Sequence, residues 1–357
     1  MSDLQLSLLA IGAVVVGAVY CYNWVQERGL RRRMQQAFGA HDDVLLRGGA
    51  EPALNDGRLE PQLAPQQPGP AEDGRRAAAA EGPSDDGPDA VLDYVAHVVA
   101  GARIPDAILG ELAGKIGACG KPARIAGRDP RSGNWQDVVR GQGGRYDALR
   151  VSLQIVNRAG AVRAAQLAIF WVAVRPSAGR IPAEAECPDT RTALKSARDL
   201  DAFCADVDVA VGLNIIAPAG AAFPGTKIRS VAEAAGFKLE PDGVFHFRNE
   251  QRQTLFTLDN HEPAPFLPES MKGLSTGGVT LLLDVPRVAR GAEVLERMLE
   301  VARHLAAALG GGLVDDNRAA LSEAGIARIK EQVRSIHAKM DLQGIPAGSA
   351  RATRLFS

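Results

Sequence analysis

Side chains that commonly do chemistry are dispersed along this chain and form no recognised catalytic pattern. Its six histidines include no HExxH motif, and none stands at metal-ligand spacing from a cysteine. Asp315 and Asp316 are adjacent carboxylates, but neighbours on a strand point to opposite faces, so the two cannot easily share a substrate proton. Ser177 and Ser275 stand in no nucleophile-elbow context. The sequence therefore predicts no catalytic residues, no metal site and no enzymatic activity.

Phosphate, redox and nucleic-acid chemistry find equally little support. The glycine run at 310–312 lacks the Lys-Ser/Thr that follows in a phosphate loop, and residues 223–227 lack the upstream glycine spacing. The formal net charge is −1 and basic runs are confined to residues 28–33, so no nucleic-acid partner and no cofactor are expected. The cysteines show no CxxC spacing, which is typical of free thiols in a reducing cytoplasm; they are Cys21, Cys119, Cys187 and Cys204.

The first structural element that the sequence predicts is a membrane anchor. Residues 4–25 carry no charged side chain, and a helix of that length is about 30 Å long, which matches the hydrocarbon core of a bilayer. Residues 1–3 precede it. The basic juxtamembrane segment 26–46 follows it and lies in the cytoplasm by the positive-inside rule. Bulky aromatic residues stand where a signal peptide would be cleaved, so we expect an uncleaved single-pass anchor.

The rest of the chain divides by composition into a linker, a globular part and a tail. Residues 47–89 are rich in Pro, Gly, Gln, Ala and acidic side chains and have too few apolar residues for a core, which predicts a disordered linker. Apolar periodicity then predicts two α+β units at 90–206 and 207–340. Residues 341–357 are expected to form a disordered tail.

Both units show the order strand, helix, strand, strand, helix, strand. This is the split β-α-β order, which predicts an antiparallel sheet with helices on one face. The first unit is expected to contain strands at 147–157 and 167–174, and Ser322 is expected to cap the last helix of the second unit. Weak similarity between residues 99–120 and 216–237 predicts a tandem duplication.

Strand alternation predicts which side chains the helices leave uncovered. On the strand at 209–216 the outward residues include Ala210 and Gly212, and they are small. If Phe245, Phe247 and Leu282 share this open face, the sheet presents a shallow apolar trough, and such a patch commonly marks a binding surface. The alternative, that the first unit or the linker covers the face, has equal weight at this point.

The second unit contains four characteristic phrases: AEAAGF (232–237), LFTLDN (255–260), FLPESMKGLSTGGVTLLLDVP (266–286) and ARHLAAALGGGLVDDNR (302–318). In these phrases it resembles the C-terminal domain of the ZipA family of bacterial division proteins. This resemblance implies a cell-division adaptor, anchored in the inner membrane by residues 4–25 with a periplasmic N-terminus and cytoplasmic domains. Its implied partner is the C-terminal tail of FtsZ, bound in an apolar groove on an exposed sheet face so that FtsZ filaments are tethered to the membrane.

The same resemblance implies a set of groove residues. Family members carry bulky apolar residues where this chain has Ala210, Gly212 and Gly243, and Phe245 and Phe247 would compensate for some of the lost contact. The residues carried over by position are Ala210, Gly212, Gly243, Phe245, His261, Thr280 and Leu282, with Arg318 at the rim, and Phe247 completes the expected peptide-binding set.

Two other functions remain open on the sequence. The protein would act as a membrane-tethered scaffold for other division or envelope proteins if the groove no longer binds the FtsZ tail. It would act as a small-molecule sensor if the two units enclose a ligand between them. The sequence also leaves self-association open.

Overall fold

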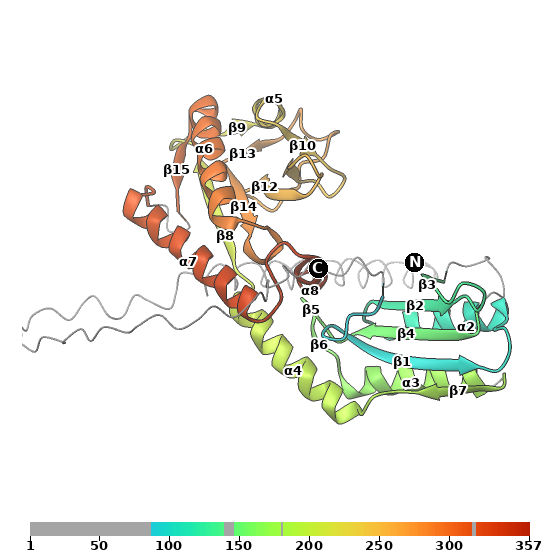
Figure 1. Cartoon of the computed structure of the whole chain (residues 1–357). Coiled ribbons are helices and arrows are strands. Elements are labelled where there is room, and N and C mark those ends of the chain that lie inside the picture. Colours follow the sequence, from blue (N-terminus) through green and yellow to red (C-terminus); the bar gives the residue numbers. More distant parts are fainter. Residues whose placement is uncertain (1–86, 139–145, 180, 316–318) are drawn as a thin grey trace, which may run out of the picture.

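The structure is a computed structural model, and it describes residues 87–138, 146–179, 181–315 and 319–357 (Figure 1). The predicted anchor at 4–25, its flanking segments at 1–3 and 26–46, and the linker up to residue 86 lie outside the described residues. Within the described part, no helix is both long enough and apolar enough to cross a membrane.

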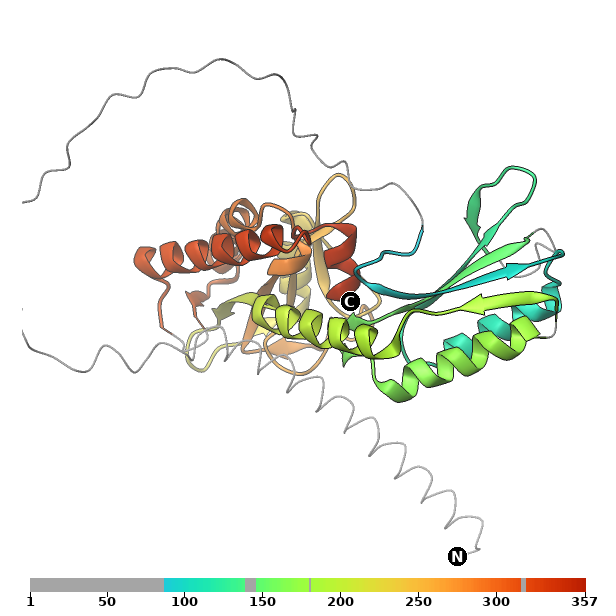
Figure 2. The same ribbon diagram turned by 60° about the horizontal axis from the view of Figure 1, so that its bottom comes forward.

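The first half folds into a five-stranded antiparallel sheet in the order β3-β2-β4-β1-β7. Helices α2 (Asp106–Gly117) and α3 (Ala164–Gly179) lie side by side on one face of this sheet (Figure 2). Helix α2 packs its Ile108, Leu112 and Ile116 inward, because residues spaced by four share one side of a helix. The strands are β1 (Asp93–Ala100), β2 (Ala123–Arg128), β3 (Trp135–Asp137), β4 (Ala148–Gln154) and β7 (Ala183–Glu186), and a short hairpin is formed by β5 (Val156–Asn157) and β6 (Gly160–Ala161).

The second half follows helix α4 (Thr190–Val207) and forms a six-stranded antiparallel sheet in the order β10-β11-β12-β14-β8-β15. Helices α5 (Gly225–Ala234) and α6 (Gly291–Leu309) are its helix layer, and α7 (Glu323–Leu342) packs on α6. The strands are β8 (Ala210–Ile216), β10 (Phe237–Leu239), β11 (Phe245–Arg248), β12 (Thr254–Asn260), β14 (Gly278–Asp284) and β15 (Gly312–Val314). Two short strands, β9 (Phe223–Pro224) and β13 (Ser275–Thr276), pair separately, and the 3-10 turn η1 (Val285–Arg287) follows β14.

The two sheets share one strand order. In the first half β7, β1, β4 and β2 lie in the same relative positions as β15, β8, β14 and β12 in the second half. The predicted α+β class with antiparallel sheets is confirmed, and the shared order supports the predicted duplication, which itself stays a prediction.

Two sequence-based expectations are wrong. Residues 167–174, expected as a strand, lie within α3, because the buried Leu167, Phe170 and Val174 recur at helical spacing within a continuous apolar run. The tail expected to be disordered at 341–357 contains helix α8 (Ala350–Leu355), whose following residue Phe356 is fully buried. The predicted cap at Ser322 is confirmed, since its hydroxyl accepts the backbone N–H of Gly325 at 3.1 Å.

Helix α8 and the β5–β6 hairpin connect the two halves. The Arg354 side chain of α8 bonds the Asp93 carboxylate of β1 at 2.5 and 3.1 Å, and its backbone carbonyl accepts from Gln154 at 2.9 Å. Lys339 of α7 pairs with Asp206 of α4 at 2.7 Å. The C-terminal residues therefore fasten the second half to the first.

Candidate functional site

The candidate site is the face of the second sheet that α5 and α6 leave uncovered, hereafter the open face. Cross-strand pairing places Thr257, Leu282 and Gly212 in one row across β12, β14 and β8. A neighbouring row contains Asp259, Thr280 and Asn214. The alternate residues Leu258, Leu281 and Leu213 point to the helix layer and are at most 1% exposed.

Leu282 lies at the centre of the open face and is half-buried. Beside it, the Thr280 hydroxyl donates to Asn214 Oδ1 at 2.7 Å and lies 3.3 Å from Nδ1 of the exposed His261. These bonds hold the Thr280 side chain in one orientation. The centre of the open face therefore offers one large apolar side chain next to fixed polar groups.

Acidic and histidine side chains surround this centre. Burial raises the pKa of Asp259, although the backbone N–H of Asn260 donates to its carboxylate at 2.8 Å and opposes that rise. His246 is held between Asp242 at 2.9 Å and Thr254 at 3.2 Å. The surroundings of Leu282 are therefore polar and partly anionic.

The expectation that Phe245 and Phe247 share this face is wrong. Phe245 is fully buried and pairs with Leu258, whose row faces the helix layer. Phe247 stacks on Phe256 at 4.5 Å between ring centroids, on the same side. Strand alternation then places His246 on the open face, and the predicted apolar trough is not formed.

The remaining groove candidates divide between the face, its edge and positions elsewhere. Ala210 pairs with Asp284 at the end of the open face. Gly243 lies in a turn with a φ of 81°, and a Cβ there would meet the Pro265 Cβ at 2.6 Å, so it is a turn residue and not a groove wall. Arg318 lies outside the described residues. The structure thus brings Ala210, Gly212, Thr280 and Leu282 together, with His261 beside them.

Sequence reasoning missed Asp259 and Thr257 as members of the face. The signal was present: Leu258 and Phe256 of β12 are apolar and buried, so the residues between them must point to the other side. These two residues change the chemistry of the face, since they add a carboxylate and a hydroxyl beside Leu282.

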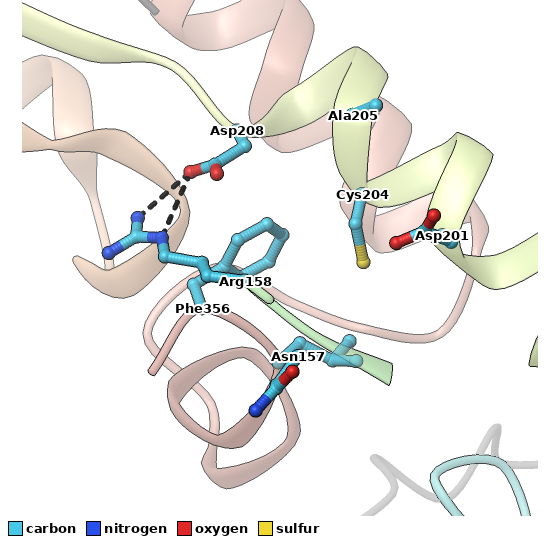
Figure 3. Close-up of a pocket in the computed structure, with 8 residues that line it drawn as sticks. Asn157, Arg158, Asp201, Cys204, Ala205, Asp208 and Phe356 are labelled. Atoms are coloured by element: carbon cyan, nitrogen blue, oxygen red, sulfur yellow. Dashed lines mark hydrogen bonds and ion pairs between the residues drawn. The ribbon is translucent and has the colours of Figure 1, made fainter. Parts of the chain in front are cut away.

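The first half of the chain contributes Arg158 to one end of the open face. This side chain donates to Asp208 at 2.8 Å (Figure 3). It also donates to Asp284 of β14 at 2.8 Å. Burial lowers the pKa of Arg158, and its bonds to the two carboxylates outweigh that effect and raise it. A cavity of about 190 Å³ lies next to this pair, lined by Asn157, Arg158, Asp201, Cys204, Ala205, Asp208, Leu355 and Phe356.

The described residues offer little for metal or thiol chemistry. No group of three or more His, Cys, Asp or Glu side chains within the described ranges is arranged to hold a metal ion. The described cysteines are free thiols, and burial raises the pKa of Cys187 to about 11 and that of Cys204 to about 12. Such thiols stay protonated at neutral pH and are poor nucleophiles.

Comparison with known proteins finds a family that matches the second half of the chain. Residues 209–332 match the family described as ZipA, C-terminal FtsZ-binding domain, and the resemblance inferred from sequence motifs is thereby confirmed. The cell division protein ZipA of Marinobacter nauticus is 31% identical over 136 residues, which are 37% of this chain and 40% of that protein. ZipA of Xanthomonas axonopodis pv. citri is 28% identical over 134 residues, or 36% of this chain and 55% of that protein.

The matched region is only part of each protein. ZipA of Ectopseudomonas mendocina is 26% identical over 144 residues, or 39% of this chain and 52% of that protein. The chain therefore spans about half, or less, of the length of the curated relatives that it matches. The first sheet lies outside the residues that match the family.

Proposed function

We propose that the protein binds the C-terminal tail of FtsZ on the open face of its second sheet and tethers FtsZ filaments to the bacterial inner membrane through residues 4–25. The observation that carries this proposal is the match of residues 209–332 to the FtsZ-binding domain of ZipA. The open face supports it, because it presents a half-buried leucine within a sheet surface that the helices do not cover.

The chemistry of the face defines how a tail would bind. An apolar tail side chain would pack on Leu282, and Thr280 and Asn214 offer hydrogen-bonding groups beside it. Burying a leucine fully contributes roughly 1.5–3 kcal/mol, and Leu282 is already partly buried, so about 1 kcal/mol remains for the tail. A single tail would therefore bind weakly, and Asp259 would favour a tail with a basic residue near this contact.

Weak binding is compatible with tethering. A filament presents many tails, and a membrane presents many copies of the anchored domain, so each further contact forms at a high effective concentration. The linker at 47–89 gives each domain the reach to find a tail.

The test is a titration of labelled FtsZ tail peptide against the full chain in detergent. Leu282→Asp is expected to lower the affinity about tenfold or more, since apolar contact is lost and a carboxylate must be desolvated. Leu342→Asp is the matched control, because Leu342 is 88% exposed and belongs to α7, away from the open face. Saturable binding that is indifferent to Leu282→Asp, or no binding to the parent chain, would contradict the proposal.

One observation favours the alternative of a scaffold for other division or envelope proteins. The face is more polar than the apolar groove that the family resemblance implies, since Phe245 and Phe247 do not reach it. In that case affinity capture with the full chain would recover such proteins, would not recover FtsZ, and would lose them on Leu282→Asp.

A further inference from the structure

The uncovered face of the first sheet contains an arginine that has no anionic partner among the described residues. Arg150 lies on the central strand β4, and its guanidinium stacks on the Trp135 ring at 4.0 Å. Its Nε is buried and has no hydrogen-bond acceptor in the described part of the chain. A buried donor without an acceptor is unfavourable, so this position calls for an oxygen ligand.

The neighbouring arginines of the same face are already paired. Arg124 bonds Asp137 at 2.7 Å, and Arg128 bonds Asp147 at 2.9 Å. Arg150 shares their surface, but no carboxylate of the described ranges pairs with it.

The chain enters the first half directly beside Arg150. Pro88 lies against this face, next to Arg124, Ala126, Asp137 and Ser152. Ala126 is the cross-strand partner of Arg150, and Ser152 is two residues along the same strand, so both flank the Arg150 side chain. The described part of the chain therefore begins close to the Arg150 guanidinium.

The sequence that precedes Pro88 has the complementary charge. Residues 81–86 (EGPSDD) contain Glu81, Asp85 and Asp86 and no cationic side chain. Asp86 and Asp85 stand two and three residues before Pro88, which allows them a reach of roughly 7–10 Å at about 3.3–3.6 Å per residue. Adjacent strand positions are about 5 Å apart, so either carboxylate can reach Arg150.

We infer that residues 81–86 dock on the open face of the first sheet, with an aspartate carboxylate accepting from the Arg150 guanidinium. A charge-assisted bond of this kind gives the guanidinium an anionic partner. At the opposite edge, β7 places the exposed Glu184 and Glu186 on this face, since Glu186 pairs with His97 and His97 with Arg150. These two carboxylates repel the acidic segment and confine it to the side of β2 and β4.

Docking of residues 81–86 shortens the free part of the linker. The free tether then ends before residue 81, and the cationic face of the first sheet is occupied by its own chain. An acidic partner would have to displace this segment before it could bind there.

The test uses the full chain with a bimane fluorophore on Ser84→Cys, since tryptophan quenches bimane on contact. The chain without this substitution, labelled in parallel, reports the native cysteines and is subtracted. Quenching at residue 84 is expected, and Trp135→Phe is expected to abolish it. Asp85→Asn with Asp86→Asn is expected to relieve it as well, and so is Arg150→Gln. Glu72→Gln with Asp73→Asn, the matched control further up the linker, is expected to leave it unchanged.

Several results would overturn the inference. One is fluorescence that Trp135→Phe leaves unchanged. Another is quenching that survives both Arg150→Gln and the loss of both aspartates, because contact would then not depend on the charge pair. A third is quenching of a labelled Trp135→Phe chain by an unlabelled parent chain, which would place the segment on a second copy. Since Asp85 and Asp86 lie outside the folded core, their substitution tests docking even if Arg150→Gln unfolds the sheet.

Discussion

Replacing Arg158 with alanine should lower the free energy of unfolding and make the two halves unfold separately. Arg158 reaches across from the first half to Asp208 and Asp284, and the three side chains are 21%, 15% and 27% exposed. Alanine would remove the cation that bonds both carboxylates at 2.8 Å and would leave Asp284 the more distant Arg287 at 3.9 Å. Removing one partner of a buried pair costs about 3–5 kcal/mol, and the partial exposure of this cluster favours the lower value, about 3 kcal/mol.

Urea unfolding of the full chain, followed by circular dichroism and tryptophan fluorescence, measures this cost. With a slope of about 3 kcal/mol per M, a loss of about 3 kcal/mol moves the midpoint by about 1 M. Trp135 and Trp171 belong to the first half and the third tryptophan, Trp24, lies in the predicted anchor, so with Trp24→Phe in every variant fluorescence reports the first half, while circular dichroism reports both. The two signals should coincide in the parent chain and separate in Arg158→Ala, because the halves lose a shared ion pair.

Two further variants show whether the charges are responsible. Adding Asp208→Asn and Asp284→Asn to Arg158→Ala should recover part of the lost stability, because no uncompensated carboxylate then remains. Arg191→Ala is the matched control, since Arg191 is 95% exposed and should change stability by less than about 0.5 kcal/mol. A midpoint for Arg158→Ala within error of that control, or no recovery in the triple variant, would refute the reasoning.

Three other substitutions test the packing and the charges of the second half. Asp259→Asn should be more stable than the parent at pH 7, since burial raises the folded pKa of Asp259 and the parent loses stability as pH rises through it; in thermal melts the difference should vanish below about pH 3.9. Phe245→Ala should lower the free energy of unfolding by about 3–5 kcal/mol in urea, because Phe245 belongs to the core. A loss under about 1 kcal/mol would contradict its placement in the core. Arg354→Ala should cost about 3 kcal/mol by the same assay, since it strands the Asp93 carboxylate, whose side chain is 2% exposed; an unchanged midpoint would show that α8 does not fasten the halves.

Local pattern was a good guide to which residues share a side of a strand and a poor guide to which side the helices cover. On β14 the three inward residues Val279, Leu281 and Leu283 are all apolar, so only one orientation buries them, and the structure agrees. On β11 alternation correctly separates Phe245 from His246. Assigning the phenylalanines to the helix layer required the pairing of Phe245 with Leu258, which alternation within one strand does not reveal.

Helix α8 shows a different limit of local sequence. A helix of six residues is not stable alone, so no local propensity announces it. It exists because Leu355 and Phe356 are buried and because Arg354 bonds Asp93, which lies 261 residues earlier in the chain. Long-range contacts of this kind leave no periodic signal in the segment itself, and composition alone therefore favoured disorder.

The two sheets show how one strand order can carry two different surfaces. The open face of the first sheet is lined by arginines, whereas that of the second surrounds Leu282 with hydroxyl, amide and carboxylate groups. Arg158 and Arg354 bond across the halves and hold these two faces in a fixed relation. The backbone from α4 into β8 joins the halves covalently and carries any pull between membrane and filament, while these ion pairs fix the orientation of one half against the other. Arg158→Ala should therefore loosen that orientation and leave the affinity for an isolated tail peptide unchanged in a peptide titration.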